Sequence, residues 1–569
     1  MPEPKNSAGF LILILGVNLI LNLGLGFYSG GGHSDASDYI TLAIQIVTQH
    51  DWGQLIMVTN GREVISLWLV LLTLFMLVFG ATNYVAIVLT GLLGTLGVFA
   101  FYRLMRLFWN ERNALCLAAI LALTPVYLVI SQNALYDGLF IVLLLTALRY
   151  YFVFFTTHTV RHLVVSGLIF SLLAFVHGSG YPYIFLVWIV FPLFDKSEHR
   201  WKHWMLFSLA AGTLPVIQML IWKFFLYGSF YPYQELAHDW SVNHDALTIE
   251  PDGLKHILRF FLILILGYTP VLFLVFWIYL LDLPVKTKKR SLAGIAVLFV
   301  VITSLLAGGV HIDSLYLLIV LLILLYHFAL KRDLSQENGL VFLFGLLSVF
   351  TFSIYIRWFP KPYFHQKHFI YPVLFLIPVY WFYAGKVIRN EYLIFGILIG
   401  AFCFQFLTDM YFHLPKNKDK SPQGFRVKYS STFTYCMPYT DEGIQKEIAT
   451  WYKNHTVKPD DYILTNRHER YVNAQLNLAQ NHYLKITDSY SLNQGFQQPT
   501  LEKTLALIDR FQPVFIHWDK ALNHSLYQTL NRDSNRQFLF SYGELASALK
   551  DRYTAVDSLD NAIVFFQRR

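Results

Sequence analysis

Long apolar runs separated by short polar loops make up the chain as far as Leu407. Runs of roughly 18 residues or more can cross about 30 Å of hydrocarbon as a helix. The first run, residues 10–27, has an almost uncharged start and no small-residue cleavage site, so we interpret it as a retained span and not as a secretory signal. The pattern predicts a polytopic α-helical membrane protein with about thirteen transmembrane helices. After the first, the predicted spans cover residues 83–101, 114–130, 139–155, 163–175, 183–194, 205–225, 257–281, 292–307, 315–330, 340–356, 370–383 and 392–407.

Residues 64–80 are also apolar enough to span, and their assignment decides the topology. Counting them as a span would put Asp137 opposite Asp35 and the basic loop 103–112 outside, against the positive-inside rule. We therefore interpret 64–80 as a helix packed within an outer loop, so that Asp35 and Asp137 share the outer face. The N-terminus is then cytoplasmic, and the basic loops 196–203, 286–290, 331–332 and 386–389 all fall on the cytoplasmic side.

This topology leaves four outer loops, at residues 29–82, 131–138, 228–256 and 357–369. In the first, a glycine-rich hinge leads to the polar stretch 33–39, which we expect to be a loop. Apolar residues at helical spacing over 39–47 predict a helix along the membrane interface, which Asp51 and Trp52 close.

The pattern changes after about His413, so residues 1–412 form the predicted membrane domain and residues 413–569 a predicted extracytoplasmic α/β domain. A charged linker at 416–421 joins them. Helices are predicted at 441–453 and 501–511, and strands at 462–465, 514–518 and 562–566. A layered unit of roughly 150 residues is an ordinary domain size.

Composition supports the membrane assignment. Of 569 residues, 55% are hydrophobic and 14% charged, which excludes an ordinary soluble globular chain. The net charge of +8 reflects the cytoplasmic loops, and no basic patch indicates nucleic-acid binding. Three cysteines give no disulfide framework.

Carboxylates in two outer loops are the candidate chemistry. Asp35 and Asp38 follow a membrane exit, and Asp137 lies in a short turn between two spans, where ionisable residues usually serve a function. Asp35 and Asp137 could together hold a divalent cation such as Mg²⁺, Mn²⁺ or Zn²⁺, or one could act as a general base that the other orients. The alternatives are solvated loop acids and, for Asp137, capping of the following helix.

Five cations lie in outer loops, where the positive-inside rule disfavours them: Arg62, Arg357, Lys361, Lys367 and His368. They could recognise a phosphate head group. The alternative is that they snorkel at the interface beside Trp358, Phe359 and Tyr363. We interpret His177 to Gly180 as a turn that ends a span, without chemistry of its own.

Three stretches in the first outer loop resemble a known family: Asp35-Ala-Ser-Asp-Tyr39 with Ala43, Asp51-Trp52, and Asn60-Gly61-Arg62-Glu63. They are similar to the first outer loop of GT-C glycosyltransferases that use polyprenyl-phosphate sugars, above all the aminoarabinose (lipid A) transferases and the protein O-mannosyltransferases. The stretch Asn133-Ala-Leu-Tyr-Asp137-Gly-Leu resembles the second acidic turn of that family, and His368-Phe369-Ile-Tyr-Pro372 an element that opens a late span.

The resemblance implies a GT-C-like fold in the plasma membrane, in bacteria the inner membrane, and inverting transfer of a monosaccharide at its outer face. Asp35 would be the catalytic base, and Asp137 would orient the acceptor or bind a metal. Asp38, Tyr39, Arg62 and Glu63 would bind substrate together with the cations of 357–369. The partners implied are a polyprenyl-phosphate-linked donor and an acceptor lipid, glycan or protein.

Two departures from the family pattern keep other functions open. Position 36 is Ala where the family usually has an acid, and Val64-Ile65-Ser66 replace a Lys-Pro-Pro segment. If the missing lysine holds the donor phosphate, Arg62 or a cation of 357–369 must replace it. The alternatives are a transporter or flippase of lipid-linked sugars, which should have broken helices or mid-span polar residues, and a catalytically inactive assembly subunit.

Overall fold

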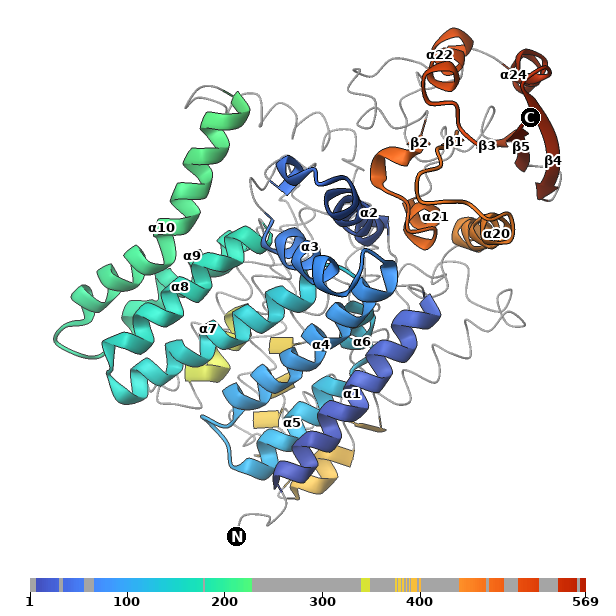
Figure 1. The fold of residues 1–569 in the computed structure, drawn as a ribbon. Coiled ribbons are helices and arrows are strands. Elements are labelled where there is room, and N and C mark those ends of the chain that lie inside the picture. Colours follow the sequence, from blue (N-terminus) through green and yellow to red (C-terminus); the bar gives the residue numbers. More distant parts are fainter. Residues whose placement is uncertain are drawn as a thin grey trace, which may run out of the picture.

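The structure, a computed structural model, describes residues 7–29, 34–55, 66–177, 180–227, 339–347, parts of 374–400, 440–466, 470–485, 500–520, 541–559 and 563–569. Its N-terminal helices are α1 (Ser7–Ser29), α2 (Ser34–Gln49), α3 (Leu67–Phe79), α4 (Asn83–Met105), α5 (Glu111–Leu123), α6 (Pro125–Gln132), α7 (Asp137–Thr157), α8 (Val160–Val176), α9 (Gly180–Phe194) and α10 (Arg200–Tyr227), with a short 3₁₀ helix, η1 (Trp52–Leu55). Helices α1 and α4 to α10 form a bundle, and α2 and α3 lie at one end of it (Figure 1).

Among the described residues, three helices are long and apolar enough to cross a membrane: Ser7–Phe27, Asn83–Met105 and Asp137–Thr157. Helices α4 and α7 form the centre of the bundle, whereas α1 exposes large apolar side chains such as Ile12 and Ile20, as lipid contact requires. The chain is thus a polytopic membrane protein. The predicted spans between 257 and 330 lie outside the described residues, so the count of about thirteen stays a prediction.

The predicted span 114–130 is wrong as one continuous helix. The structure has two helices, α5 and α6, which meet at Thr124 in an extended conformation. Pro125 is the first residue of α6, and a residue before proline avoids the helical region because the proline ring collides with it. The break is therefore dictated by Pro125, although the apolar run continues through it.

Helix α3 is too short to cross a membrane. Its 13 residues span about 20 Å, and Ser66 caps its start by accepting a hydrogen bond from the Leu69 N–H at 3.3 Å. Trp68 and Leu72 are buried on the side that packs against α2 and α4, while Val78 on the other side is 73% exposed. This geometry agrees with an apolar helix that stays within the outer loop.

Buried polar side chains join α1 to α4 and α5 inside the bundle. Asn18 donates to the Ala122 carbonyl at 2.8 Å and accepts from Asn22 at 2.8 Å and from Thr95 at 3.2 Å. The helices approach closely here, since a Cβ on Gly94 would lie 2.5 Å from the Ser131 Cβ. Small residues and interhelical hydrogen bonds of this kind hold membrane helices together, where burial of apolar surface gives little driving force.

The C-terminal part contains a five-stranded sheet in the order β2-β1-β3-β5-β4. The strands are β1 (Ile463–Thr465), β2 (Tyr483–Lys485), β3 (Phe515–Asp519), β4 (Tyr553–Leu559) and β5 (Ile563–Arg568), and β1 pairs in parallel with β2 and β3. Helices α22 (Leu501–Phe511) and α24 (Tyr542–Leu549) share a core with Ile516 and Trp518. Helix α20 (Thr440–Asn454) packs on the other face with Phe515 and Phe565, which makes three layers.

The predicted first and last residues of five elements lie within two residues of the observed ones. These elements are α20, α22, β1, β3 and β5. The structure adds strands β2 and β4, helix α24 and the short helices α21 (Arg470–Gln475) and η5 (Gln480–His482), which we did not predict. The boundary at 413 and the linker at 416–421 lie outside the described residues.

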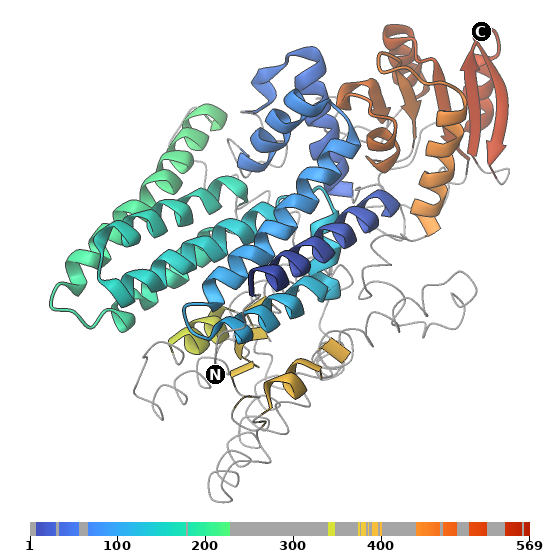
Figure 2. The same cartoon turned by 60° about the horizontal axis from the view of Figure 1, so that its bottom comes forward.

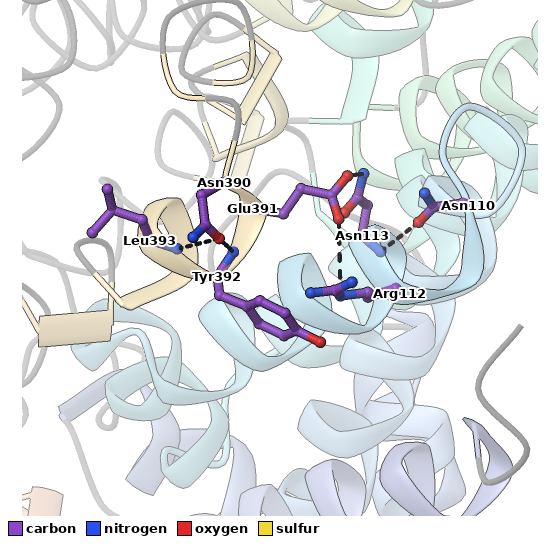
Figure 3. A network of polar contacts seen from close by, with 7 residues as sticks. All are labelled: Asn110, Arg112, Asn113, Asn390, Glu391, Tyr392 and Leu393. Atoms are coloured by element: carbon purple, nitrogen blue, oxygen red, sulfur yellow. Dashed lines mark hydrogen bonds and ion pairs between the residues drawn. The ribbon is translucent and has the colours of Figure 1, made fainter. Parts of the chain in front are cut away.

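The C-terminal part with the five-stranded sheet, residues 440–569, is called the sheet domain below. One end of the bundle carries α2, the first residues of α4 and α7, and the sheet domain. We call this end the outer end and the opposite end the inner end. Both views place the sheet domain beside α2 and α3 (Figures 1 and 2). At the inner end, Glu391 accepts a hydrogen bond from the Asn113 side chain at 3.0 Å and lies 3.9 Å from the Arg112 guanidinium, which is 3.4 Å from the centre of the Tyr392 ring (Figure 3). The start of α5 and the segment 390–392 therefore meet at this end.

Candidate functional site

Helix α2 contains the acidic stretch of the first outer loop. We predicted a loop at 33–39 and a helix from Tyr39, but α2 begins at Ser34, so the loop assignment is wrong. The physical reason is that two acids, Asp35 and Asp38, lie among the first five residues of α2, near the positive end of the helix dipole, which favours helix formation. Both acids therefore stand on a rigid element. Asp38 is half-buried, and the side chain of Asp35 lies outside the described atoms.

Asp137 is the first residue of α7, and only 2% of it is exposed. The capping hypothesis for Asp137 is wrong, because Tyr136 occupies the cap position and makes no side-chain cap hydrogen bond. The next residue, Gly138, packs against α4, where an added Cβ would lie 3.4 Å from the Leu93 Cβ. A carboxylate at a helix N-terminus is stabilised by the dipole, which offsets part of the cost of burying it.

Aromatic rings bring the two acidic stretches together. The Tyr39 ring, one residue after Asp38, makes an edge contact with the Tyr136 ring at 6.4 Å between centroids. Tyr136 also stacks on the His177 ring at 4.2 Å and 8°. The first turn of α2, the first turn of α7 and the end of α8 therefore meet at the outer end. The helices that carry Asp35 and Asp137 both begin at this end.

Six predicted site residues lie outside the described residues: Arg62, Glu63, Arg357, Lys361, Lys367 and His368. Their proposed roles in binding substrate stay predictions. Among the predicted residues that the structure describes, Tyr39 contacts Tyr136, which directly precedes Asp137.

His177 is a residue of this site that sequence reasoning missed. We interpreted residues 177–180 as a turn that ends a span. Helix α8 ends at Val176 and α9 starts at Gly180, where a Cβ would lie 2.6 Å from the Leu173 backbone carbon. What the pattern did not reveal is the stacking of His177 on Tyr136. The available signal was weak: a titratable residue at the outer end of a span.

The predicted metal site has only partial support from the described atoms. Within the part of the chain that the structure describes, no group of three or more His, Cys, Asp and Glu side chains could hold a metal ion. Asp137 offers one buried carboxylate, an oxygen ligand suited to a hard divalent cation. A cation shared by Asp35 and Asp137 therefore stays a proposal.

No family model matches the chain, and no curated protein matches it. Among solved structures, it is similar to ArnT from Cupriavidus metallidurans bound to undecaprenyl phosphate, at 12% identity and a TM-score of 0.48, over 99% of this chain and 98% of that one. It is also similar to the archaeal oligosaccharyltransferase AglB from Archaeoglobus fulgidus in complex with an inhibitory peptide and a dolichol-phosphate, at 13% identity and a TM-score of 0.45, over 99% of this chain and 74% of that one. ArnT and AglB are members of the GT-C superfamily. With TM-scores of 0.45 and 0.48, these similarities by themselves assign no activity to this chain.

Proposed function

We propose that this chain is a membrane glycosyltransferase that moves a monosaccharide from a polyprenyl phosphate to an acceptor hydroxyl at the outer face of the membrane, with inversion at the sugar carbon. The observation that carries the proposal is the contact between Tyr39 and Tyr136, which joins the acidic N-terminal part of α2 to the start of α7, where Asp137 is buried. Carboxylates held on rigid helices at the edge of the bilayer suit a reaction whose donor arrives within the lipid.

In the proposed reaction, the Asp35 carboxylate takes the proton of the acceptor hydroxyl. The acceptor oxygen forms a bond to the anomeric carbon from the face opposite the leaving group. The bond from that carbon to the phosphate oxygen breaks, and the polyprenyl phosphate leaves with the electron pair. Proton removal by a positioned base contributes about 10² to 10⁴ in rate.

Asp137 orients the acceptor or helps to hold a divalent cation, whose charge would stabilise the leaving phosphate. The cations Arg62, Arg357, Lys361, Lys367 and His368 would neutralise the same group. Asp38, Tyr39 and Glu63 would line the sugar. Support for these roles comes from the sequence pattern, and for Asp137 also from its burial in a helix first turn.

The test is sugar transfer and sugar release by purified protein in liposomes, given a panel of polyprenyl-phosphate sugars with and without chelator. Asp35→Asn and Asp137→Asn are compared with wild type. Asp51→Asn is the matched control, because Asp51 follows the far end of α2 and accepts hydrogen bonds from Gln54 at 3.0 Å and Gln45 at 3.5 Å. We expect a loss of about 100-fold or more in the first two variants and near-normal turnover in the control.

Two results would overturn the proposal. Lipid binding without turnover by any protein would favour an inactive assembly subunit. Movement of the intact lipid-linked sugar across the liposome membrane, without cleavage, would favour a transporter. Loss of activity in the chelator arm alone would add a metal to the proposed site without changing the reaction class.

A further inference from the structure

We propose that the segment 470–482 of the sheet domain positions helix α2 and helix α4 for sugar transfer, with Asn477, Asn481 and His482 as positioning residues. This inference rests on the proposed function. Its physical basis is that the segment contacts α2, which carries Asp35, and α4, which packs against Gly138 next to Asp137. The positions of these two helices set the distance between the two carboxylates.

The first observation is the burial of α2. Every residue from Ala36 to Ile46 is buried except Asp38, which is half-buried. A helix lying on a membrane surface would leave one face in water. Here α3 packs against one side of α2, and α21 and η5 of the sheet domain pack against another, as Figure 1 also shows. Ala474 of α21 is fully buried in the same apolar core as the membrane helices.

The second observation is a set of hydrogen bonds at the end of α2. The side-chain amides of Gln49 and Asn481 donate to each other at 3.0 Å in both directions. Nε2 of Gln49 also lies 3.1 Å from Nε2 of His482, whose Nδ1 lies 3.1 Å from the Pro459 carbonyl oxygen. Because a carbonyl can only accept, neutral His482 carries its proton on Nδ1 and accepts from Gln49. The side-chain amides of Gln49 and Asn481 therefore each have one orientation in which all of these hydrogen bonds form.

The third observation is a helix cap supplied by the sheet domain. The Asn477 side-chain oxygen accepts a hydrogen bond from the Asn83 backbone N–H at 2.8 Å, in the first turn of α4. The residue at the cap position of α4, Thr82, makes no side-chain cap bond of its own. Asn477 has a φ of 54°, in the left-handed region that asparagine tolerates better than most residues. The sheet domain thus completes the outer end of α4.

These contacts connect to the carboxylates by short routes. Helix α2 carries Asp35 and Asp38 among its first five residues. Helix α4 continues from Asn83 to Leu93, which packs against Gly138 next to Asp137. A shift of the sheet domain would therefore move α2 and α4 relative to each other. Misplacement of reacting groups by about 1 Å can cost about 100-fold in rate.

The functional test uses Asn477→Gly, which keeps the left-handed backbone and removes the capping amide, and Asn477→Asp, which keeps an acceptor oxygen. We expect Asn477→Gly to lower kcat by about 10-fold to about 100-fold with the KM for the donor unchanged. Asn477→Asp should stay near wild type. The amount of folded protein is measured in parallel, and an apparent fall in kcat that disappears when turnover is expressed per folded molecule would overturn the positioning role.

Crosslinking tests the contact independently of activity. Gln49→Cys and Asn481→Cys are combined in a chain whose Cys116, Cys403 and Cys436 are replaced by serine, with a protease site inserted at 416–421. After treatment with a short bismaleimide and cleavage, the two fragments should stay joined. The control pair is Gln49→Cys with Lys550→Cys, since Lys550 is exposed at the end of α24, and its fragments should separate.

The outcomes separate the two proposals. Separated fragments in the Gln49 and Asn481 pair would overturn the contact and with it the positioning role. Joined fragments with no sugar transfer by wild type would overturn the proposed function, and the positioning role would fall with it, while the contact would stand. Joined fragments that restore kcat in Asn477→Gly would support positioning, because the crosslink replaces the lost contact without altering the carboxylates.

Discussion

The inner and outer ends of the helix bundle hold their acidic side chains differently. At the inner end, each of three carboxylates lies beside a basic side chain: Glu111 at 2.6 Å from Arg106, Glu391 at 3.9 Å from Arg112, and Asp195 at 2.8 Å from His203. At the outer end, Asp137 is buried in a helix first turn, next to a tyrosine that contacts two further rings. The inner-end acids connect neighbouring segments, whereas Asp137 stands next to the ring contacts of the proposed site, where ionisable residues usually serve a function. Substitutions at the inner end should therefore change stability, and those at the outer end turnover.

Among the substitutions that test this difference between the two ends, we expect the largest effect at Tyr136. Tyr136→Leu removes the ring that joins Tyr39 to His177, so we expect kcat for sugar transfer to fall about 10-fold with little change in the thermal midpoint. Tyr136→Phe is the matched control, because it keeps both ring contacts. If the phenylalanine variant is as slow as the leucine variant, the hydroxyl group matters and the packing role is wrong.

A smaller effect is expected at the inner end from Arg112→Ala. The variant loses the contact with Glu391 and the stacking on Tyr392, which together are worth about 1 to 2 kcal/mol. We expect a lower thermal midpoint in detergent and transfer activity within about 2-fold of wild type at low temperature, because the site is at the other end of the bundle. Arg112→Lys keeps the charge but not the planar stacking, so its thermal midpoint should lie between those of wild type and Arg112→Ala. A large loss of turnover in Arg112→Ala would contradict the expectation that substitutions at the inner end change stability and not turnover.

The smallest expected effect is the pH dependence that Asp195 contributes. Burial acts to raise the pKa of Asp195, but the Ser197 N–H and hydroxyl and the His203 ring act in the opposite direction, and the net result is a lowered pKa. The ionised form is thus favoured by folding. Its stabilisation is present above the ordinary carboxyl pKa of about 4 and is lost as pH falls through the lower folded value. Asp195→Asn should flatten the fall in thermal midpoint below about pH 4, and an unchanged pH dependence would contradict this assignment.

Local sequence patterns predicted much of the described fold. Apolar runs located α1, α4 and α7 because length and hydropathy are enough to identify a span. The charge of the 103–112 loop predicted that 64–80 does not span the bilayer, and α3 is too short to cross it. The pattern failed at Thr124, where an apolar run hides a proline break, and at β4, whose burial does not alternate along the strand.

The candidate site was predictable only in part. Acids in two loops on one face could be inferred from charge and topology, since both follow from the sequence. The stacking of Tyr136 on His177 and the hydrogen bond from Asn83 to Asn477 join segments far apart in the chain, and no local periodicity reports such pairs. The helical start at Ser34, by contrast, was open to local reasoning, since acids near a helix N-terminus favour helix formation.

The cap that Asn477 supplies to α4 has a consequence for the order of assembly. The two residues are 394 positions apart, so α4 is synthesised long before its outer end can be completed. A nascent chain that already contains both carboxylates still lacks the residue that finishes this helix. The outer face should therefore reach its final arrangement only after nearly the whole polypeptide has left the ribosome, and incomplete chains should be unable to act on lipid at the membrane surface.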